Sequence, residues 1–207
     1  MGSVGGSVAA VVTKTLNITS GSSSSSNSLR DACREGEDKI ISINEEDKNI
    51  LIEYVESVEV PATNSGAANT LLNAGGKLFT GSKFVHQGLI FGVPGDDYYV
   101  CQTYPIQLVK CNDYNDALDK IKNNWAINKD VKNENLIKTW YVSNDKFCLS
   151  CVKEVLENFP NKYNLFDYNC QHFCSNIIKK FRLKKQDIIC RICIRQFQPI
   201  CDNHKNK

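Results

Sequence analysis

Cys170 is the residue whose type and position best suit nucleophilic chemistry. Asn169, which precedes it, is a residue type preferred at helix N-caps, and apolar residues follow at helical spacing. These apolar positions are Phe173, Cys174, Ile177, Ile178 and Phe181. The first turn of a helix carries unpaired N–H groups and a partial positive charge, so we expect the Cys170 thiol to ionise below its ordinary pKa of about 8.5. The sequence therefore predicts a thiolate nucleophile.

Acyl transfer through a thiolate also needs a base to hold the proton, and the chain has three histidines. His172 lies two residues after Cys170 on the same helix, where side chains do not meet. His204 lies in a polar tail, whereas His86 belongs to residues 83–91, a run with strand character. The same strand face carries Phe84, Gly88 and Ile90. We therefore expect His86 to be the base. The alternative is that Cys170 is a small buried apolar residue and His86 a structural histidine.

Two short motifs carry a resemblance to known proteins. His86 lies in a His-x-Gly-hydrophobic strand sequence, and Asn-Cys-Gln-His-Phe follows at residues 169–173. This order is similar to the lecithin:retinol acyltransferase (LRAT) family of the permuted papain-like superfamily, whose signature is Asn-Cys-Glu-His-Phe. Tyr-Asn-Leu-Phe at residues 163–166 also resembles the neighbouring PPPDE family of thiol isopeptidases. The resemblance covers roughly residues 77–182. It implies an α+β, permuted papain-like fold in which an antiparallel sheet carrying His86 packs against a helix carrying Cys170.

The same resemblance implies a reaction. Cys170 would form an acyl-enzyme with His86 as base, in a lipid acyl hydrolase or acyltransferase; the PPPDE-like alternative is a cysteine isopeptidase acting on ubiquitin-like conjugates. LRAT-like enzymes usually orient the base with a second histidine, and near that position this chain has Gln102, with Cys101 one register step away. A glutamine amide orients an imidazole but carries no charge. A catalytically inactive binding or scaffold module is therefore a third alternative, and no cofactor is implied.

Composition divides the chain into four parts. Residues 1–35 are rich in Gly and Ser and predict a flexible tail. Residues 36–76 predict an N-terminal extension, residues 77–185 the LRAT-like catalytic core, and residues 186–207 a basic, cysteine-rich tail. In the core, three strand-like runs predict an antiparallel meander. The runs are 83–91, 98–103 and 106–109.

Two helices are expected after the meander. Asp113 should cap the first, and Ser143 or Asn144 should open the second, which Pro160 ends. The apolar stripe of the first helix is Tyr114, Ala117, Leu118, Ile121 and Trp125. The stripe of the second is Phe147, Cys148, Cys151, Val152, Val155, Leu156 and Phe159. Both patterns predict helices that pack on the sheet.

Two groups of cysteines remain. Cys148 and Cys151 lie on the apolar stripe of the second helix, so we favour core packing over a redox or zinc site. Four residues near the C-terminus could fill a tetrahedral zinc site. They are Cys190, Cys193, Cys201 and His204. The alternative, which we favour, is an ordinary strand at residues 188–195.

Bulk composition suits one domain with tails, since the 207 residues are 42% hydrophobic and carry a net charge of +2. The chain has ten cysteines and no secretory signal, so we expect reduced thiols in the cytoplasm. It contains no run of about 18 apolar residues, so we expect no membrane-spanning helix. From Lys179 to Lys207, nine basic minus two acidic residues leave a charge of +7. This charge predicts peripheral attachment to an anionic membrane surface, or a solvated basic face. No stacking ladder or binding motif accompanies it, so we expect no nucleic-acid partner.

Overall fold

The computed structural model describes residues 33–35, 38–61, 73, 85–103, 105–124, 131–164 and 169–186. Several sequence predictions lie outside these residues. They are the Gly/Ser-rich tail up to residue 32, the basic residues beyond 186, and the zinc candidates Cys190, Cys193, Cys201 and His204.

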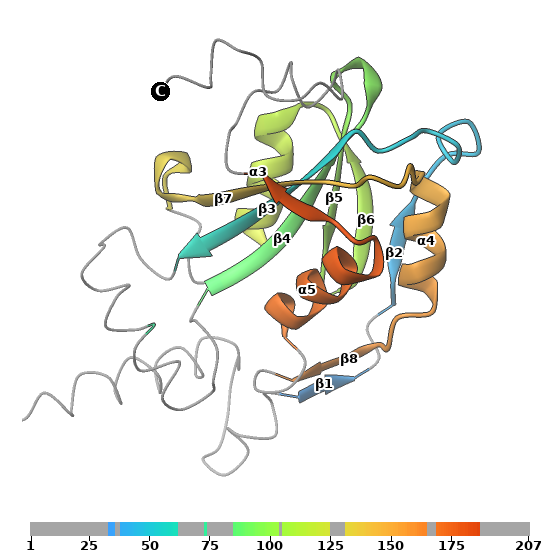
Figure 1. Cartoon of the computed structure of the whole chain (residues 1–207). Helices are drawn as coiled ribbons and strands as arrows, with labels where there is room; N and C mark the ends of the chain where they lie inside the picture. The colour runs from blue at the N-terminus through green and yellow to red at the C-terminus, as the bar shows by residue number, and fades with distance from the viewer. Residues whose placement is uncertain are drawn as a thin grey trace, which may run out of the picture.

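A seven-stranded mixed sheet forms the centre of the fold (Figure 1). Its strand order is β2-β6-β5-β4-β3-β7-β9. The strands are β2 (Ile40–Ser42), β3 (Tyr54–Pro61), β4 (Val85–Gly92), β5 (Tyr98–Gln102), β6 (Gln107–Cys111), β7 (Ile137–Val142) and β9 (Lys184–Gln186). Neighbouring strands are antiparallel except β2 and β6, which are parallel. The expected meander is confirmed, because β4, β5 and β6 are consecutive antiparallel neighbours.

Two pairings join segments that are far apart in sequence. β3 lies between β4 and β7, so residues 36–76, expected as an N-terminal extension, supply a strand of the sheet itself. A second, two-stranded sheet pairs β1 (Cys33–Glu35) with β8 (Lys162–Asn164). Residues 33–35 therefore form a strand, although composition assigned them to the flexible tail.

Three α-helices lie in the described part of the chain: α3 (Tyr114–Asn123), α4 (Leu149–Glu157) and α5 (Cys170–Lys180). Short 3-10 helices are η2 (Pro94–Asp96) and η3 (Asn133–Asn135). The expected cap of α3 is confirmed, because the Asp113 carboxylate accepts a hydrogen bond from the Asp116 amide at 2.8 Å. Among these helices, none is long and apolar enough to cross a membrane.

The start of α4 differs from the prediction. The helix begins at Leu149 and not near residue 143. Residues 147–149 are held extended by the segment at 50–52, through hydrogen bonds from the Ile52 amide to the Phe147 carbonyl (3.0 Å) and from the Leu149 amide to the Ile50 carbonyl (3.1 Å). This long-range pairing overrides the local helical pattern.

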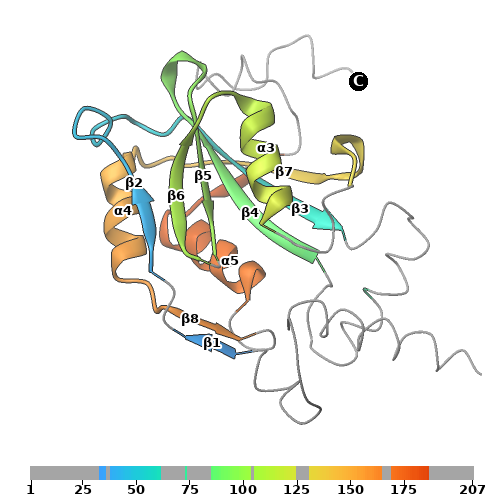
Figure 2. The ribbon, with the colours of Figure 1, turned by 180° about the vertical axis from the view of Figure 1, so that it is seen from behind.

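The two faces of the sheet bury separate cores. α4 and α5 cover one face and α3 covers the other, as Figures 1 and 2 show from opposite sides. Leu89 and Phe91 of β4 pack with α4 and α5, whereas Ile90, between them, packs with α3. Successive strand side chains point to opposite faces, so each residue of β4 can be assigned to one helix layer. Full burial of one such side chain contributes roughly 2 kcal/mol of stability.

Candidate active site

The first turn of α5 is built on Asn169. The backbone of Asn169 is extended, and its Oδ1 accepts hydrogen bonds from the amides of Gln171 (3.0 Å) and His172 (3.2 Å). The His172 ring turns back to the same oxygen, with Nδ1 at 2.9 Å. The predicted N-cap is therefore confirmed, and Cys170 is the first residue of the helix.

This first turn docks on the beginning of β4. The Cys170 thiol, 2% exposed, donates to the Val85 carbonyl at 3.7 Å, and the Gln171 side-chain amide donates to the same oxygen at 3.5 Å. One turn further on, the Cys174 thiol donates to the Gln87 carbonyl at 3.5 Å. Since β5 pairs with β4 only from Leu89 onward, these contacts occupy the part of β4 that lies before the β5 pairing begins. The thiol thus reaches the backbone of the residue preceding His86.

The His86 side chain lies on the opposite face of β4 from α5. His86 alternates with Gly88 and Ile90, as predicted, and pairs with Val60 in a regular register. A Cβ added at Gly88 would meet the Ile121 side chain of α3 at 3.0 Å, so this face points toward α3. The residues that flank His86 at 85 and 87 instead contact α5.

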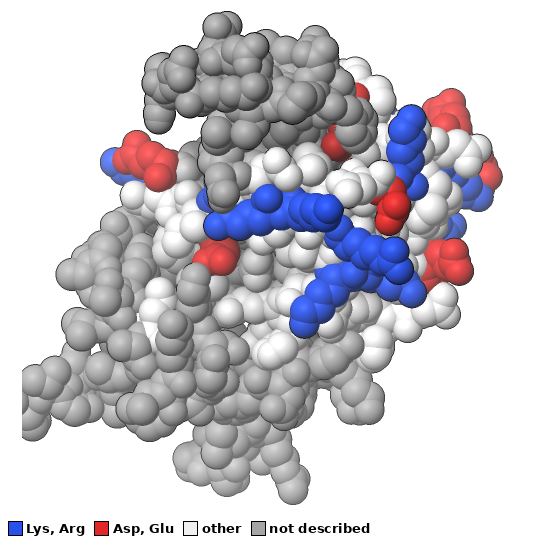
Figure 3. All heavy atoms as spheres, in the orientation of Figure 1, with Lys and Arg blue, Asp and Glu red and all other residues white. Residues whose placement is uncertain are grey.

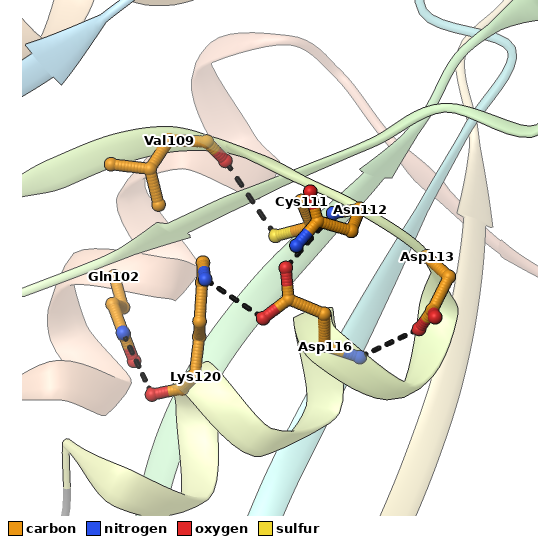
Figure 4. A network of polar contacts seen from close by, with 7 residues as sticks. All are labelled: Gln102, Val109, Cys111, Asn112, Asp113, Asp116 and Lys120. Carbon is orange, nitrogen blue, oxygen red and sulfur yellow. Dashed lines mark hydrogen bonds and ion pairs between the residues drawn. The ribbon is translucent and has the colours of Figure 1, made fainter.

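Gln102 joins His86 to α3. Its Oε1 lies 3.2 Å from His86 Nε2. Its Nε2 donates to the Lys120 carbonyl at 3.2 Å, the contact that Figure 4 shows. A carbonyl oxygen can accept but cannot donate a hydrogen bond, so the NH₂ group of the Gln102 amide faces Lys120 and the amide oxygen faces the ring. In the neutral ring, the proton therefore sits on Nε2.

The structure distinguishes Gln102 from Cys101 at the position where LRAT-like enzymes have a second histidine. Cys101 pairs with Leu89, is fully buried and faces the α4–α5 core. Burial raises the pKa of its thiol. Gln102, one residue on, lies on the His86 face and contacts the ring. Of these two residues, Gln102 and not Cys101 contacts the His86 ring.

The charge states differ from those expected. Burial raises the pKa of the Cys170 thiol to about 11, although the backbone amides of Gln87 and Gln171 act to lower it. The prediction that the helix N-terminus lowers this pKa is thus wrong, because desolvation of a thiolate outweighs the partial charge of the helix end. Burial also lowers the pKa of His86 to about 4, although the hydrogen bond that the ring donates to the Gln102 oxygen acts to raise it. At neutral pH the site holds a neutral thiol and a neutral imidazole.

The structure therefore assembles two pairs. His86 is hydrogen-bonded to Gln102, and Cys170 is hydrogen-bonded to the backbone of Val85, beside His86. In the described contacts the thiol bonds to this carbonyl rather than to the ring, since the two side chains approach β4 from different faces.

Two contributors to the site were missed by the sequence analysis. The Lys120 carbonyl fixes the Gln102 amide, and the Glu59 carboxylate acts to raise the pKa of Cys170. Glu59 pairs with Gln87 across β3 and β4, and its alternation with Val58 and Val60 is the sequence signal that could have placed it on the Cys170 face. The contribution of the Lys120 carbonyl could not be found in this way, because every residue has a backbone carbonyl and the sequence does not show which one a side chain contacts.

Exposed basic residues lie near the C-terminal end of α5 and along β9. Figure 3 shows Lys and Arg side chains gathered in a band over the face that carries these elements. The exposed members are Lys179, Lys180, Arg182, Lys184 and Lys185. Within the described residues, no group of three or more His, Cys, Asp or Glu side chains is arranged to hold a metal ion.

Comparison with known proteins identified no relative of this chain. A scan of protein-family models, a search of curated proteins and a search of solved structures each found no match to this chain. The fold is therefore assigned as a mixed α+β protein with a seven-stranded sheet.

Proposed function

We propose that this chain is an LRAT-like thiol enzyme that forms an acyl-enzyme on Cys170 from a lipid ester. The observation that carries the proposal is the buried contact of His86 with Gln102, whose amide is fixed by the Lys120 carbonyl. This contact orients the His86 ring, which acts as the base toward the Cys170 thiol. Gln102 has the role of the second histidine of LRAT-like enzymes.

The reaction starts from neutral groups. The Cys170 thiol and the His86 ring approach β4 from different faces, so transfer of the thiol proton to His86 as Sγ attacks the ester carbonyl requires the first turn of α5 to move relative to β4. The imidazolium then returns the proton to the leaving alcohol. Water or an acceptor amine or hydroxyl resolves the thioester. The Gln102 amide orients the ring throughout but does not offset its positive charge.

The basic band supports a lipid substrate. Five exposed Lys and Arg side chains between residues 179 and 185 lie in the last turn of the helix that begins with Cys170 and in the segment that follows it. Basic residues near an anionic membrane surface contribute about 1 kcal/mol each to binding, so this band would hold the protein where lipid esters are concentrated. A permuted papain-like arrangement with peripheral membrane attachment is the corresponding proposal for fold and location.

Intact-mass spectrometry tests the proposal. The full chain is incubated separately with an activated lipid ester and with a ubiquitin-like propargylamide probe. We expect an adduct with the lipid ester that disappears in Cys170→Ala and His86→Ala. It should persist in the matched control Cys174→Ala, one turn along α5. An adduct with the ubiquitin-like probe alone would indicate an isopeptidase, and no adduct with either would indicate a scaffold; both outcomes overturn the proposal.

A further inference from the structure

A second pair of thiols lies at the start of α4. The Sγ atoms of Cys148 and Cys151 are 3.0 Å apart, and the Ser150 hydroxyl lies 3.0 Å from the Cys148 sulfur. Both cysteines are partly exposed, and Cys151 also packs against the α4–α5 core, as the sequence analysis expected. These two thiols are therefore accessible to a small reagent and to one another.

The approach of the two sulfurs follows from the backbone at Cys148. Cys148 is the N-cap of α4, with φ −117 and ψ 170, so it is extended and not helical. Two contacts keep the Cys148 backbone extended: the bridge between Cys148 and Leu51, and the hydrogen bond from the Leu149 amide to the Ile50 carbonyl. An N-cap side chain lies over the first turn and faces the residue three positions on, which here is Cys151.

The two thiols differ in acidity. Partial burial acts to raise the pKa of Cys148, but hydrogen bonds from Cys151 and Ser150 outweigh it and hold that pKa below its ordinary value. The hydrogen bond to Cys148 holds the pKa of Cys151 above its ordinary value. The amides of Ser150 and Cys151, which also bond to the carbonyls of Lys48 and Cys148, act on the Cys148 sulfur in the same direction and lower its pKa. Cys148 is the better nucleophile.

We propose that Cys148 and Cys151 form a redox-active dithiol that reacts with low-molecular-weight disulfides. The Cys148 thiolate attacks one sulfur of the reagent, which breaks the reagent's S–S bond, forms a mixed disulfide and releases one thiolate. The Cys151 thiolate then attacks the Cys148 sulfur and releases the second thiolate. The dithiol loses two electrons and two protons, and the reagent gains them as two thiols. A metal site is the weaker alternative, because among the described residues no third ligand joins the pair.

Mass spectrometry of the full chain tests this proposal. The reduced protein is exposed to glutathione disulfide, quenched in acid and alkylated with N-ethylmaleimide under denaturing conditions. Trypsin then releases residues Phe147–Lys153, which contain Cys148 and Cys151 and no other cysteine. We expect this peptide to become unlabelled and two hydrogens lighter. The peptide Phe84–Lys110, which contains the buried Cys101, should stay labelled.

Single substitutions identify the two roles. Cys151→Ser should accumulate glutathione on Cys148, because the resolving thiol is missing. Cys148→Ser should react with glutathione disulfide more slowly than Cys151→Ser, because the remaining Cys151 lacks the hydrogen bonds from Ser150 that lower the pKa of Cys148. The proposal is overturned if the wild-type peptide stays labelled or if each cysteine carries its own glutathione. Equal rates in the two variants would overturn it as well.

Discussion

The His86 ring and the Gln102 side chain are joined by a buried contact of 3.2 Å between Nε2 and Oε1. Both side chains are almost fully buried, so the ring has little freedom to rotate and its hydrogen bond does not compete with bulk water. The other end of the Gln102 amide is held by a carbonyl of α3, which is itself part of a helical hydrogen bond to the Asn124 amide. The orientation of the imidazole therefore depends on how α3 packs on the sheet.

Gln102→Ala should lower the rate of Cys170 acylation by about tenfold to hundredfold, because the ring loses the group that orients it. The lipid ester should still bind, so KM should change little while kcat falls. Stopped-time intact-mass measurements give the rate. Gln107→Ala, which removes the glutamine opposite Gln102 on β6, is the matched control and should leave the rate unchanged. Equal losses in both variants would mean that Gln102 acts through stability alone.

Stability should fall in mild acid because of His86. Its pKa is near 4 in the folded chain against an ordinary value of 6.5, so between these pH values the unfolded chain binds a proton that the folded chain does not. The free energy of unfolding therefore decreases as the pH falls from about 6.5 toward 4, by roughly 3 kcal/mol in total. Urea titrations at several pH values measure the slope. His86→Gln should show a flatter slope; an unchanged slope would contradict the assignment.

The features that the sequence predicted correctly are local ones. The caps at Asn169 and Asp113 depend on hydrogen bonds that span two or three residues, and the face of His86 depends on alternation within one strand. Gln102 could be found because β4 and β5 are joined by a short turn, which fixes which residues lie opposite one another.

The features that the sequence did not predict depend on distant contacts. The start of α4 is set by pairing between residues 147–149 and residues 50–52, about one hundred positions away in the chain. The high pKa of Cys170 results from the packing of α5 on β4, which buries the thiol so completely that the helix N-terminus cannot lower its pKa. The pairing of residues 147–149 with 50–52 has no periodic signal in the sequence, and the periodicity of α5 does not indicate how deeply its first turn is buried.

Cys170 should remain a neutral thiol well into the alkaline range, because burial raises its pKa to about 11. The difference in thiolate ultraviolet absorbance between the wild type and Cys170→Ser should stay near zero up to about pH 9 and grow by about tenfold per pH unit as the thiolate fraction rises. A clear thiolate signal below pH 8 would show instead that the helix N-terminus dominates over burial.

The cap of α5 should affect both stability and reactivity. Asn169→Ala removes the oxygen that accepts from the amides of Gln171 and His172, and should cost about 1 kcal/mol of unfolding free energy. It should also slow acylation, because Cys170 belongs to the turn that frays. Asp113→Ala, the corresponding cap loss at α3, is the control: we expect a similar loss of stability and a smaller change in acylation rate. Urea denaturation and intact-mass kinetics measure the two quantities.

Gly88→Ala should reveal the dependence of the ring on α3. The added methyl group would lie 3.0–3.2 Å from three carbon atoms of Ile121, so the helix or its side chain must shift, at a cost of about 1–3 kcal/mol. Ile121 follows Lys120, whose carbonyl holds Gln102, so the acylation rate should fall together with the stability.

Adding Ile121→Val to Gly88→Ala should restore part of both losses, because the shorter side chain makes room for the new methyl group and the two residues are in contact. Gly95→Ala is the control. Gly95 has φ +85 and no atom within 4 Å of an added Cβ, so its substitution strains only the η2 turn. It should lower stability without changing acylation, and Ile121→Val should not rescue it. Strictly additive effects of Gly88→Ala and Ile121→Val would contradict the coupling between this contact and the His86 ring.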